Sequence, residues 1–116
     1  MRVLHHVNVN VPRGDSESVA GFYGDVLGFD RIPRPDNGRE GIWLDMGDGT
    51  QLHLSERDDV PNPQPHFALV VDDFAGVQDR LAKIGAEFEP AEDIFGTGAR
   101  GFTRDPAGNR IELIGR

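Results

Sequence analysis

An internal repeat limits the fold of this chain more than any other feature of its sequence. Alternating apolar residues and helical spacing predict the order β-α-β-β-β in each half, and the segment RDDVPNPQP, with its three prolines, separates the halves. The halves are also similar in sequence: HVNVNV at 6–11 resembles HFALVV at 66–71, and GTQLHL at 49–54 resembles GNRIEL at 108–113. We therefore expect an α+β protein built from two similar modules.

Apolar patterns and turn signals also predict where the modules and their strands begin and end. We expect one domain, with a first module at about residues 1–57, a proline-rich linker at 58–65 and a second module at 66–116. The expected strands lie at 3–11, 29–33, 41–47, 50–56, 66–73, 86–90, 100–104 and 110–116.

One helix is expected in each module. The first begins after Asp15 or Ser16 and ends at Gly28, and the second begins after Asp72 or Asp73 and ends at Gly85. The second helix has the clearer apolar stripe, which consists of Phe74, Val77, Leu81 and Ile84.

Composition argues against several classes of function. The chain has no cysteine, so neither a disulfide framework nor a thiolate nucleophile or ligand is available. The net charge of −8, with 12 scattered basic residues, argues against a nucleic-acid partner. No apolar run reaches the length of a membrane span, and the N-terminal MRVLHHV lacks the apolar core of a signal peptide. We expect a cytoplasmic protein.

The repeat places residues that bind metals at equivalent positions. In the overlay His6 falls on His66 and His53 falls on Glu112, and the spacing within the two pairs differs by one residue. Successive side chains of a strand point to opposite faces. If the apolar residues of each strand face the helix, the residues between them must lie on the other face of the sheet. All four candidates then share the polar, concave face of the modules, whereas His5 falls on the opposite face.

Imidazoles and a single carboxylate predict a site for one divalent metal ion. This donor set suits Zn²⁺, Ni²⁺, Co²⁺, Fe²⁺ or Mn²⁺, and geometry would choose among them. With only one protein carboxylate the bound ion keeps a positive charge. It would then polarise a substrate carbonyl or lower the pKa of a bound water.

Other residues on the polar face are candidates for contact with a small substrate. Asn8 and Asn10 follow His6 on its face, and Phe102 and Arg110 lie near Glu112 in the final hairpin. Trp43 alternates with apolar neighbours and is a candidate for the wall of a pocket or for a dimer interface. Arg110 is equally a candidate for an ion pair with Glu112.

Five stretches spread over nearly the whole chain resemble one protein family. They read LHHVNVNV, FYGDVLGF, GDGTQLHL, HFALVVDD and DPAGNRIEL. They resemble the vicinal oxygen chelate superfamily, which includes glyoxalase I, fosfomycin-resistance proteins, methylmalonyl-CoA epimerase, extradiol dioxygenases and bleomycin-resistance proteins. FYGDVLGF and DPAGNRIEL together are specific for the superfamily but not for the reaction of any one member.

The resemblance implies that each βαβββ module is an incomplete barrel around a metal, with ligands from its first and last strands. In this chain those ligands are His6, His53, His66 and Glu112, although several members lack the ligand that corresponds to His53. The resemblance also implies a homodimer, because short members pair two chains. In such a dimer His6 and His53 of one subunit join His66 and Glu112 of the other.

Departures from individual members leave several functions open. Asn10 stands where glyoxalase I carries an arginine for glutathione, and Asn8 stands where fosfomycin thiol transferases carry Thr or Cys. The resemblance is most consistent with an isomerase or lyase that acts on a hydroxy-carbonyl substrate, in which Glu112 moves a proton. The alternatives are a non-haem Fe(II) ring-cleaving dioxygenase and a non-catalytic protein that binds drugs or metabolites.

Overall fold

The computed structural model describes residues 4–36, 38–58, 60 and 66–116. The chain divides into two compact units, Met1–Pro61 and Asn62–Arg116. The expected linker at 58–65 lies outside the described residues, apart from Asp58 and Val60. No helix of the described part is long and apolar enough to cross a membrane.

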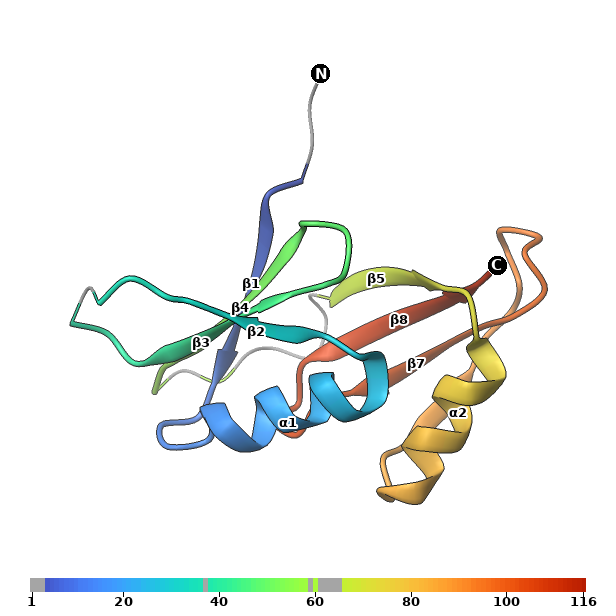
Figure 1. Ribbon diagram of the computed structural model, residues 1–116. Helices are drawn as coiled ribbons and strands as arrows, with labels where there is room; N and C mark the ends of the chain where they lie inside the picture. The colour runs from blue at the N-terminus through green and yellow to red at the C-terminus, as the bar shows by residue number, and fades with distance from the viewer. Residues whose placement is uncertain (1–3, 37, 59, 61–65) are drawn as a thin grey trace. The chain divides into compact units, whose positions relative to one another are not determined.

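The first unit is one mixed sheet with a helix on one face. Its elements are β1 (His6–Val11), α1 (Ser16–Leu27), β2 (Asp30–Ile32), β3 (Gly41–Asp45) and β4 (Gln51–Glu56). The strands lie in the order β1-β4-β3-β2, with β1 parallel to β4 and the other neighbours antiparallel. Helix α1 packs against β2, β3 and β4 (Figure 1).

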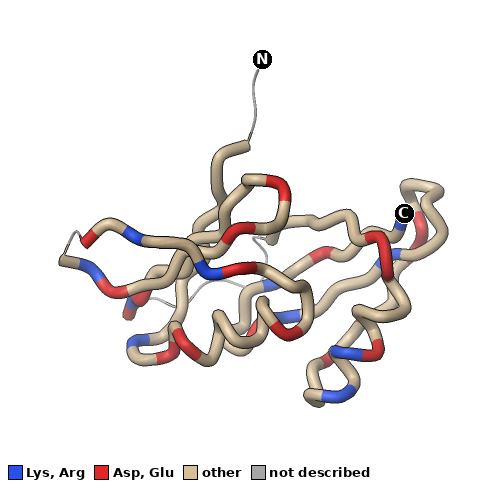
Figure 2. Tube along the Cα trace, viewed as in Figure 1, with Lys and Arg blue, Asp and Glu red and all other residues tan. Residues whose placement is uncertain are grey.

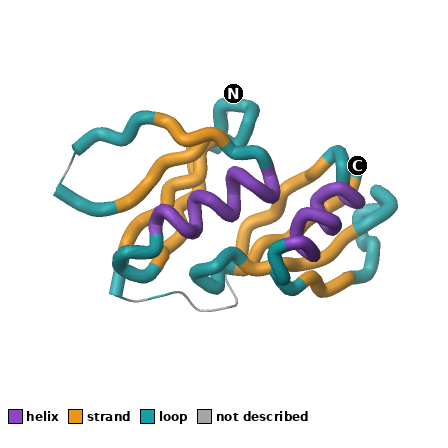
Figure 3. The backbone as a smooth tube through the Cα atoms, turned by 60° about the horizontal axis from the view of Figure 1, so that its bottom comes forward, coloured by secondary structure: helices purple, strands orange, loops and turns teal. Residues whose placement is uncertain are grey.

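The second unit repeats this plan. Its elements are β5 (His66–Val71), α2 (Phe74–Lys83), β6 (Phe88–Pro90), β7 (Arg100–Arg104) and β8 (Arg110–Gly115). The sheet order is β5-β8-β7-β6, again with one parallel pair, β5 and β8. Each unit has a single helix over its strands in the described part of the chain (Figure 3).

The expected α+β fold with two βαβββ modules is confirmed, and both sheets are open. The repeat extends to the pairing register. Asn8 pairs with His53 across β1 and β4, and Ala68 pairs with Glu112 across β5 and β8. The first and last strands of each module are therefore hydrogen-bonded neighbours, which brings together residues far apart in the sequence.

Apolar side chains of the first unit meet between α1 and the sheet. The fully or nearly fully buried ones are Val11, Val19, Tyr23, Val26, Leu44, Leu52 and Leu54. Burying a side chain of this size stabilises a fold by roughly 1.5–3 kcal/mol. Gly28 ends α1 in the left-handed conformation, with φ 74°, and its N–H donates to the carbonyl of Gly24 as expected for a helix C-cap.

The second helix differs from expectation at its C-terminal end. Val77 and Leu81 are buried, but α2 ends at Lys83 and Ile84 is 52% exposed. The predicted stripe was therefore wrong at Ile84, because the helix ends before this residue and the chain forms a tight turn at Ile84 and Gly85. At the other end, the Asp73 carboxylate accepts the Gly76 N–H as an N-cap.

Several strands are shorter than their apolar patterns predicted. Strand β1 begins at His6, after the 64% exposed Leu4, and Val3 lies outside the described residues. Strand β3 ends at Asp45, where the turn toward Thr50 begins. The alternation itself is confirmed, because Val9 and Val11 are buried while His6 and Asn8 are exposed.

Acidic positions are spread over both units, with basic positions between them (Figure 2).

Candidate functional site

The first candidate pair consists of two stacked imidazoles on neighbouring strands. The rings of His6 on β1 and His53 on β4 are nearly parallel, with centroids 4.0 Å apart. The indole of Trp43 stacks on the other face of His53 at 3.9 Å, because Trp43 and His53 pair directly across β3 and β4. His53 is therefore only 7% exposed, although it lies on the polar face of the sheet.

Each of these imidazoles has one nitrogen engaged by a neighbouring side chain. His53 Nε2 contacts Gln51 Oε1 at 2.8 Å, and His6 Nδ1 contacts Nδ1 of His5 at 2.9 Å. We expected His5 on the opposite face from His6. His5 instead precedes β1, where strand alternation does not apply, and its ring contacts that of His6. In the described part of the chain, His6 Nε2 and His53 Nδ1 make no hydrogen bond and remain available to a ligand.

The environment of His53 favours the neutral imidazole. Burial lowers its pKa from 6.5 to about 4, and the positive charges of His6, His5 and Arg34 act in the same direction. A neutral ring is the form that binds a metal ion.

In the metal-free protein we expect His53 to gain a proton only near pH 4. The unfolded chain would protonate this side chain near pH 6.5 and so binds more protons than the folded chain between these values. The free energy of unfolding should therefore fall as the pH decreases from 6.5 toward 4, and His53→Gln should remove this part of the pH dependence. Titration of ¹⁵N-labelled histidine by NMR measures the midpoint directly, and a value near 6.5 would contradict the expectation.

The second candidate pair lies at the equivalent place in the second unit. His66 Nε2 on β5 and Glu112 Oε1 on β8 are 3.0 Å apart. Arg100 on β7 donates from Nε to the other carboxylate oxygen, Glu112 Oε2, at 2.9 Å. Glu112 is 6% exposed, so both of its oxygens are held in a largely enclosed setting.

The charge state of Glu112 follows from two opposing effects. Burial of the carboxyl favours its neutral form, but the hydrogen bonds and charges of Arg100 and His66 outweigh burial. The pKa of Glu112 therefore lies below its ordinary value, and the carboxylate is ionised at neutral pH.

Aromatic and cationic side chains surround this second pair. Phe102 pairs with Glu112 across β7 and β8, and its ring meets that of His66 edge to face, with centroids 5.9 Å apart. The guanidinium carbon of Arg110 lies 3.8 Å from the centroid of Phe102, and that of Arg100 lies 5.0 Å from it. The ion pair with Glu112 that was an alternative for Arg110 is made by Arg100 instead.

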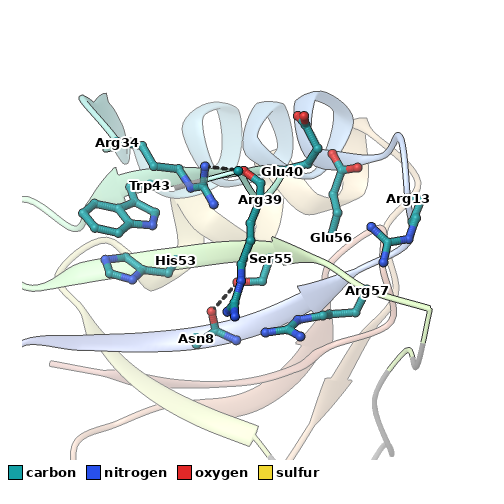
Figure 4. A pocket seen from close by; sticks show the side chains of 11 residues that line it. Asn8, Arg13, Arg34, Arg39, Glu40, Trp43, His53, Ser55, Glu56 and Arg57 are labelled. Carbon is teal, nitrogen blue, oxygen red and sulfur yellow. Dashed lines mark hydrogen bonds between the residues drawn. The ribbon is translucent and has the colours of Figure 1, made fainter. Parts of the chain in front are cut away.

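A pocket opens on the polar face of the first unit beside His53. Its cavity has a volume of about 500 Å³, and Trp43 and His53 form one end of it (Figure 4). Asn8 lines it as well and accepts a hydrogen bond from Ser55 Oγ at 2.6 Å. Asn10 does not line the pocket and contacts the side chain of Asn8 at 3.4 Å.

No three His, Asp or Glu side chains gather as a metal-binding cluster within either unit's described residues. Each unit contributes one pair of candidate ligands: His6 with His53, and His66 with Glu112.

A family model described as the glyoxalase/bleomycin resistance protein/dioxygenase superfamily matches residues 3–113. The chain belongs to this superfamily. No curated protein matches the sequence.

Solved structures of the superfamily's fold resemble the chain along its whole length. A glyoxalase family protein from Bacillus anthracis is 28% identical, with a TM-score of 0.86, and the match covers 100% of this chain and 96% of that one. The fosfomycin resistance protein FosX from Listeria monocytogenes, solved with Mn(II) and 1S,2S-dihydroxypropylphosphonic acid, is 16% identical, with a TM-score of 0.83 and coverage of 100% and 94%. The antibiotic-binding protein TnmS3 from Streptomyces sp. CB03234 is 25% identical, with a TM-score of 0.74 and coverage of 99% and 98%.

Reasoning from the sequence and from the superfamily resemblance did not single out several residues that contact the candidate ligands. Arg100 shares a strand face with Phe102, so alternation from Phe102 would have placed it near Glu112. Gln51, two residues before His53, is found by the same rule. The arginines of the pocket lie mainly in loops or just beyond strand ends, where no periodicity assigns a face.

Proposed function

We propose that this protein is a divalent-metal-dependent enzyme of the isomerase or lyase type. Its substrate would be a small molecule that carries neighbouring hydroxyl and carbonyl oxygens. The observation that carries the proposal is the recurrence of a contacting pair of metal-binding side chains at the same place in both modules. His6 and His53 from one module, with His66 and Glu112 from another, would bind one Zn²⁺, Ni²⁺, Fe²⁺, Mn²⁺ or Co²⁺ ion.

Two of the four proposed ligands, His53 and Glu112, are in the protonation state that such an ion requires. His53 is neutral at neutral pH, because its pKa lies at about 4. His6 Nε2 and His53 Nδ1 make no hydrogen bond within the described residues. Glu112 is ionised, and because Arg100 holds Oε2, Oε1 is the oxygen on the side of His66. Residues that orient a ligand in this way strengthen metal binding.

The proposed chemistry divides between the metal and the chain. When bound, the metal would polarise a substrate carbonyl and stabilise the negative charge that develops when the adjoining carbon loses its proton. Glu112 would accept that proton from one carbon and return it to the neighbouring carbon, while the hydroxyl proton moves to the former carbonyl oxygen, so that the substrate is isomerised. Arg100 keeps Oε2 in place during the transfer. Asn8, Trp43, Phe102 and Arg110 are the proposed substrate contacts, whereas Asn10, which does not line the pocket, supports the side chain of Asn8.

We further propose that the chain acts as a homodimer in which each site takes one pair from each subunit. The test mixes two inactive variants, His6→Ala/His53→Ala and His66→Ala/Glu112→Ala. With shared sites, a mixed dimer regains one complete set of four ligands, so metal content should rise from none to about half of an equivalent per chain in that dimer. Elemental analysis after mixing and separation measures this.

Two results would count against the shared arrangement. If all four ligands come from one chain, neither variant has a complete set and mixing restores no metal. If the protein elutes as a monomer at micromolar concentration and still binds one equivalent of metal, the dimer is not needed. Mixing each variant with itself is the matched control.

A second candidate is a protein that binds an antibiotic or metabolite without chemistry. It is favoured by the likeness to the antibiotic-binding protein TnmS3 and by the pocket of about 500 Å³ beside Trp43. This function needs no metal. Purified protein that takes up none of the five metals, yet still binds a small molecule beside Trp43, would favour it over the enzyme.

Proton exchange tests the reaction itself. Metal-loaded wild-type protein in deuterated solvent should exchange the α-proton of a hydroxy-carbonyl substrate, and Glu112→Gln, which is expected to lose both the metal and the base, should not. Absence of exchange across a panel of such compounds would refute the isomerase or lyase. If the native protein carries iron and consumes oxygen with catechols, it is instead a non-haem dioxygenase, which also uses two histidines and a carboxylate.

A further inference from the structure

The pocket beside His53 has a charge opposite to that of the protein. The chain has a formal net charge of −8. The charged residues that line the pocket are Arg13, Arg34, Arg39, Arg57, Glu40 and Glu56. Arginines therefore outnumber carboxylates by two among the residues that line the pocket. A cleft lined mainly by one sign of charge concentrates ligands of the other sign.

Several of the charged side chains that line the pocket make hydrogen bonds within the first unit. The Glu56 carboxylate accepts the Gly14 N–H at 2.9 Å and the Ser16 hydroxyl at 2.6 Å. Arg13 donates to Asp58 at 2.8 Å at the rim. Arg34 Nη1 donates to the carbonyl of Arg39 and so ties together the two ends of the loop between β2 and β3. These contacts fix the positions of the groups that line the pocket.

Two arginines approach the pocket from different segments. Arg57 directly follows β4 and makes no ion pair or hydrogen bond through its side chain within the described residues. Arg39 lies in the loop before β3, and its side chain extends toward Asn8, as does that of Arg57 (Figure 4). An anion bound between two guanidinium groups of one cavity can accept charged hydrogen bonds from both.

We propose that this pocket binds the anionic group of a small molecule, a phosphonate or carboxylate, between Arg39 and Arg57. Apolar or planar atoms next to the anion would lie against Trp43, the aromatic wall of the same cavity. This inference deepens the proposed function by assigning a substrate class. It rests on the proposed function in one respect, namely that the reactive oxygens of the substrate point toward His53. Guanidinium groups suit both anions because they donate paired hydrogen bonds to two oxygens.

Metal-free protein tests the pocket separately from the metal. The probes are methylphosphonate, phenylphosphonate and benzoate, with benzyl alcohol as a neutral analogue, and isothermal titration calorimetry measures their affinities. We expect the three anions to bind, phenylphosphonate more tightly than methylphosphonate, and benzyl alcohol not to bind. Arg39→Gln and Arg57→Gln should each weaken phenylphosphonate about tenfold, as the loss of a charged hydrogen bond implies.

Arg80→Gln on α2 is the matched control, because it removes the same charge from the other unit. It should leave the affinity for phenylphosphonate unchanged. Equal weakening by Arg80→Gln, or no binding of any anion at millimolar concentration, would overturn the proposal. Trp43→Leu should remove the advantage of phenylphosphonate over methylphosphonate, and Arg39→Gln and Arg57→Gln still decide the matter if that variant does not fold.

The two proposals fail in distinguishable ways. Metal uptake is measured on the wild-type protein in the absence of phosphonate. Anion binding that depends on Arg39 and Arg57, in a protein that takes up no metal, would sustain this inference and refute the enzyme. Metal uptake in a protein that binds none of the anions would do the reverse.

Discussion

Glu112→Gln is expected to abolish metal binding at physiological metal concentrations. The substitution keeps the size of the side chain but removes the only carboxylate among the four proposed ligands. It also leaves the Arg100 guanidinium, now 2.9 Å from Oε2, beside the site without its counter-charge. Substitutions of residues that merely orient a ligand weaken metal binding by about 10–100-fold, so loss of this ligand should exceed about 100-fold. Calorimetry with Zn²⁺ and Mn²⁺ measures the affinity.

Two further variants make the result specific. Arg100→Gln removes the group that holds Glu112 Oε2 but keeps the carboxylate, and we expect a smaller loss of about tenfold. Glu87→Gln removes an exposed carboxylate of the same unit, one that pairs with Arg104, and should not change the affinity. Metal binding by Glu112→Gln at wild-type strength would refute the proposed ligand set.

Asp105→Ala is expected to lower the free energy of unfolding by about 3 kcal/mol. Asp105 is 4% exposed and organises the turn between β7 and β8, where the sequence reads DPAGN. Its Oδ1 accepts the N–H groups of Ala107 and Asn109, each at 2.9 Å, and its Oδ2 accepts Asn109 Nδ2 at 2.7 Å. A buried donor left without a partner costs about 1–3 kcal/mol. Urea unfolding of the metal-free protein measures the change.

Asp93→Ala is the matched control for this effect. Asp93 also accepts two backbone N–H groups, from Thr97 and Gly98, but it lies in an exposed loop where water replaces a lost acceptor. We expect a change below about 1 kcal/mol. Similar losses in the two variants would mean that burial of the Asp105 turn does not set its contribution.

The sequence predicted the fold and the neighbourhoods of the four proposed ligands because strand alternation has a fixed period. Once Val9 and Val11 are assigned to the face under α1, His6 and Asn8 must lie on the other face. The repeat extends the same assignment to the second module, where Phe67 and Leu69 lie on the helix side. The contact of His66 with Glu112 follows from this face assignment and from the parallel pairing of β5 with β8.

Strand alternation could not predict the directions of side chains in loops, or contacts that depend on the register between strands. Arg39 lies in the loop before β3 and Arg57 follows the end of β4, so neither has a periodic neighbour that assigns its direction. The deep burial of His53 depends on ring stacking with Trp43, which requires the cross-strand register between β3 and β4. The exposure of Ile84 depends on where α2 leaves its sheet, which the apolar spacing alone does not reveal.

The parallel pairing of first and last strands has a consequence for how each module is made. Strand β4 lies between β1 and β3, and β8 lies between β5 and β7, yet each is the last strand of its module to leave the ribosome. Until it arrives, the first strand has no partner in the sheet, and closing so long a loop is slow. Each stacked or hydrogen-bonded pair of candidate ligands forms only at this last step, so an ion that needs both pairs would bind only after both kinds of module are translated and folded.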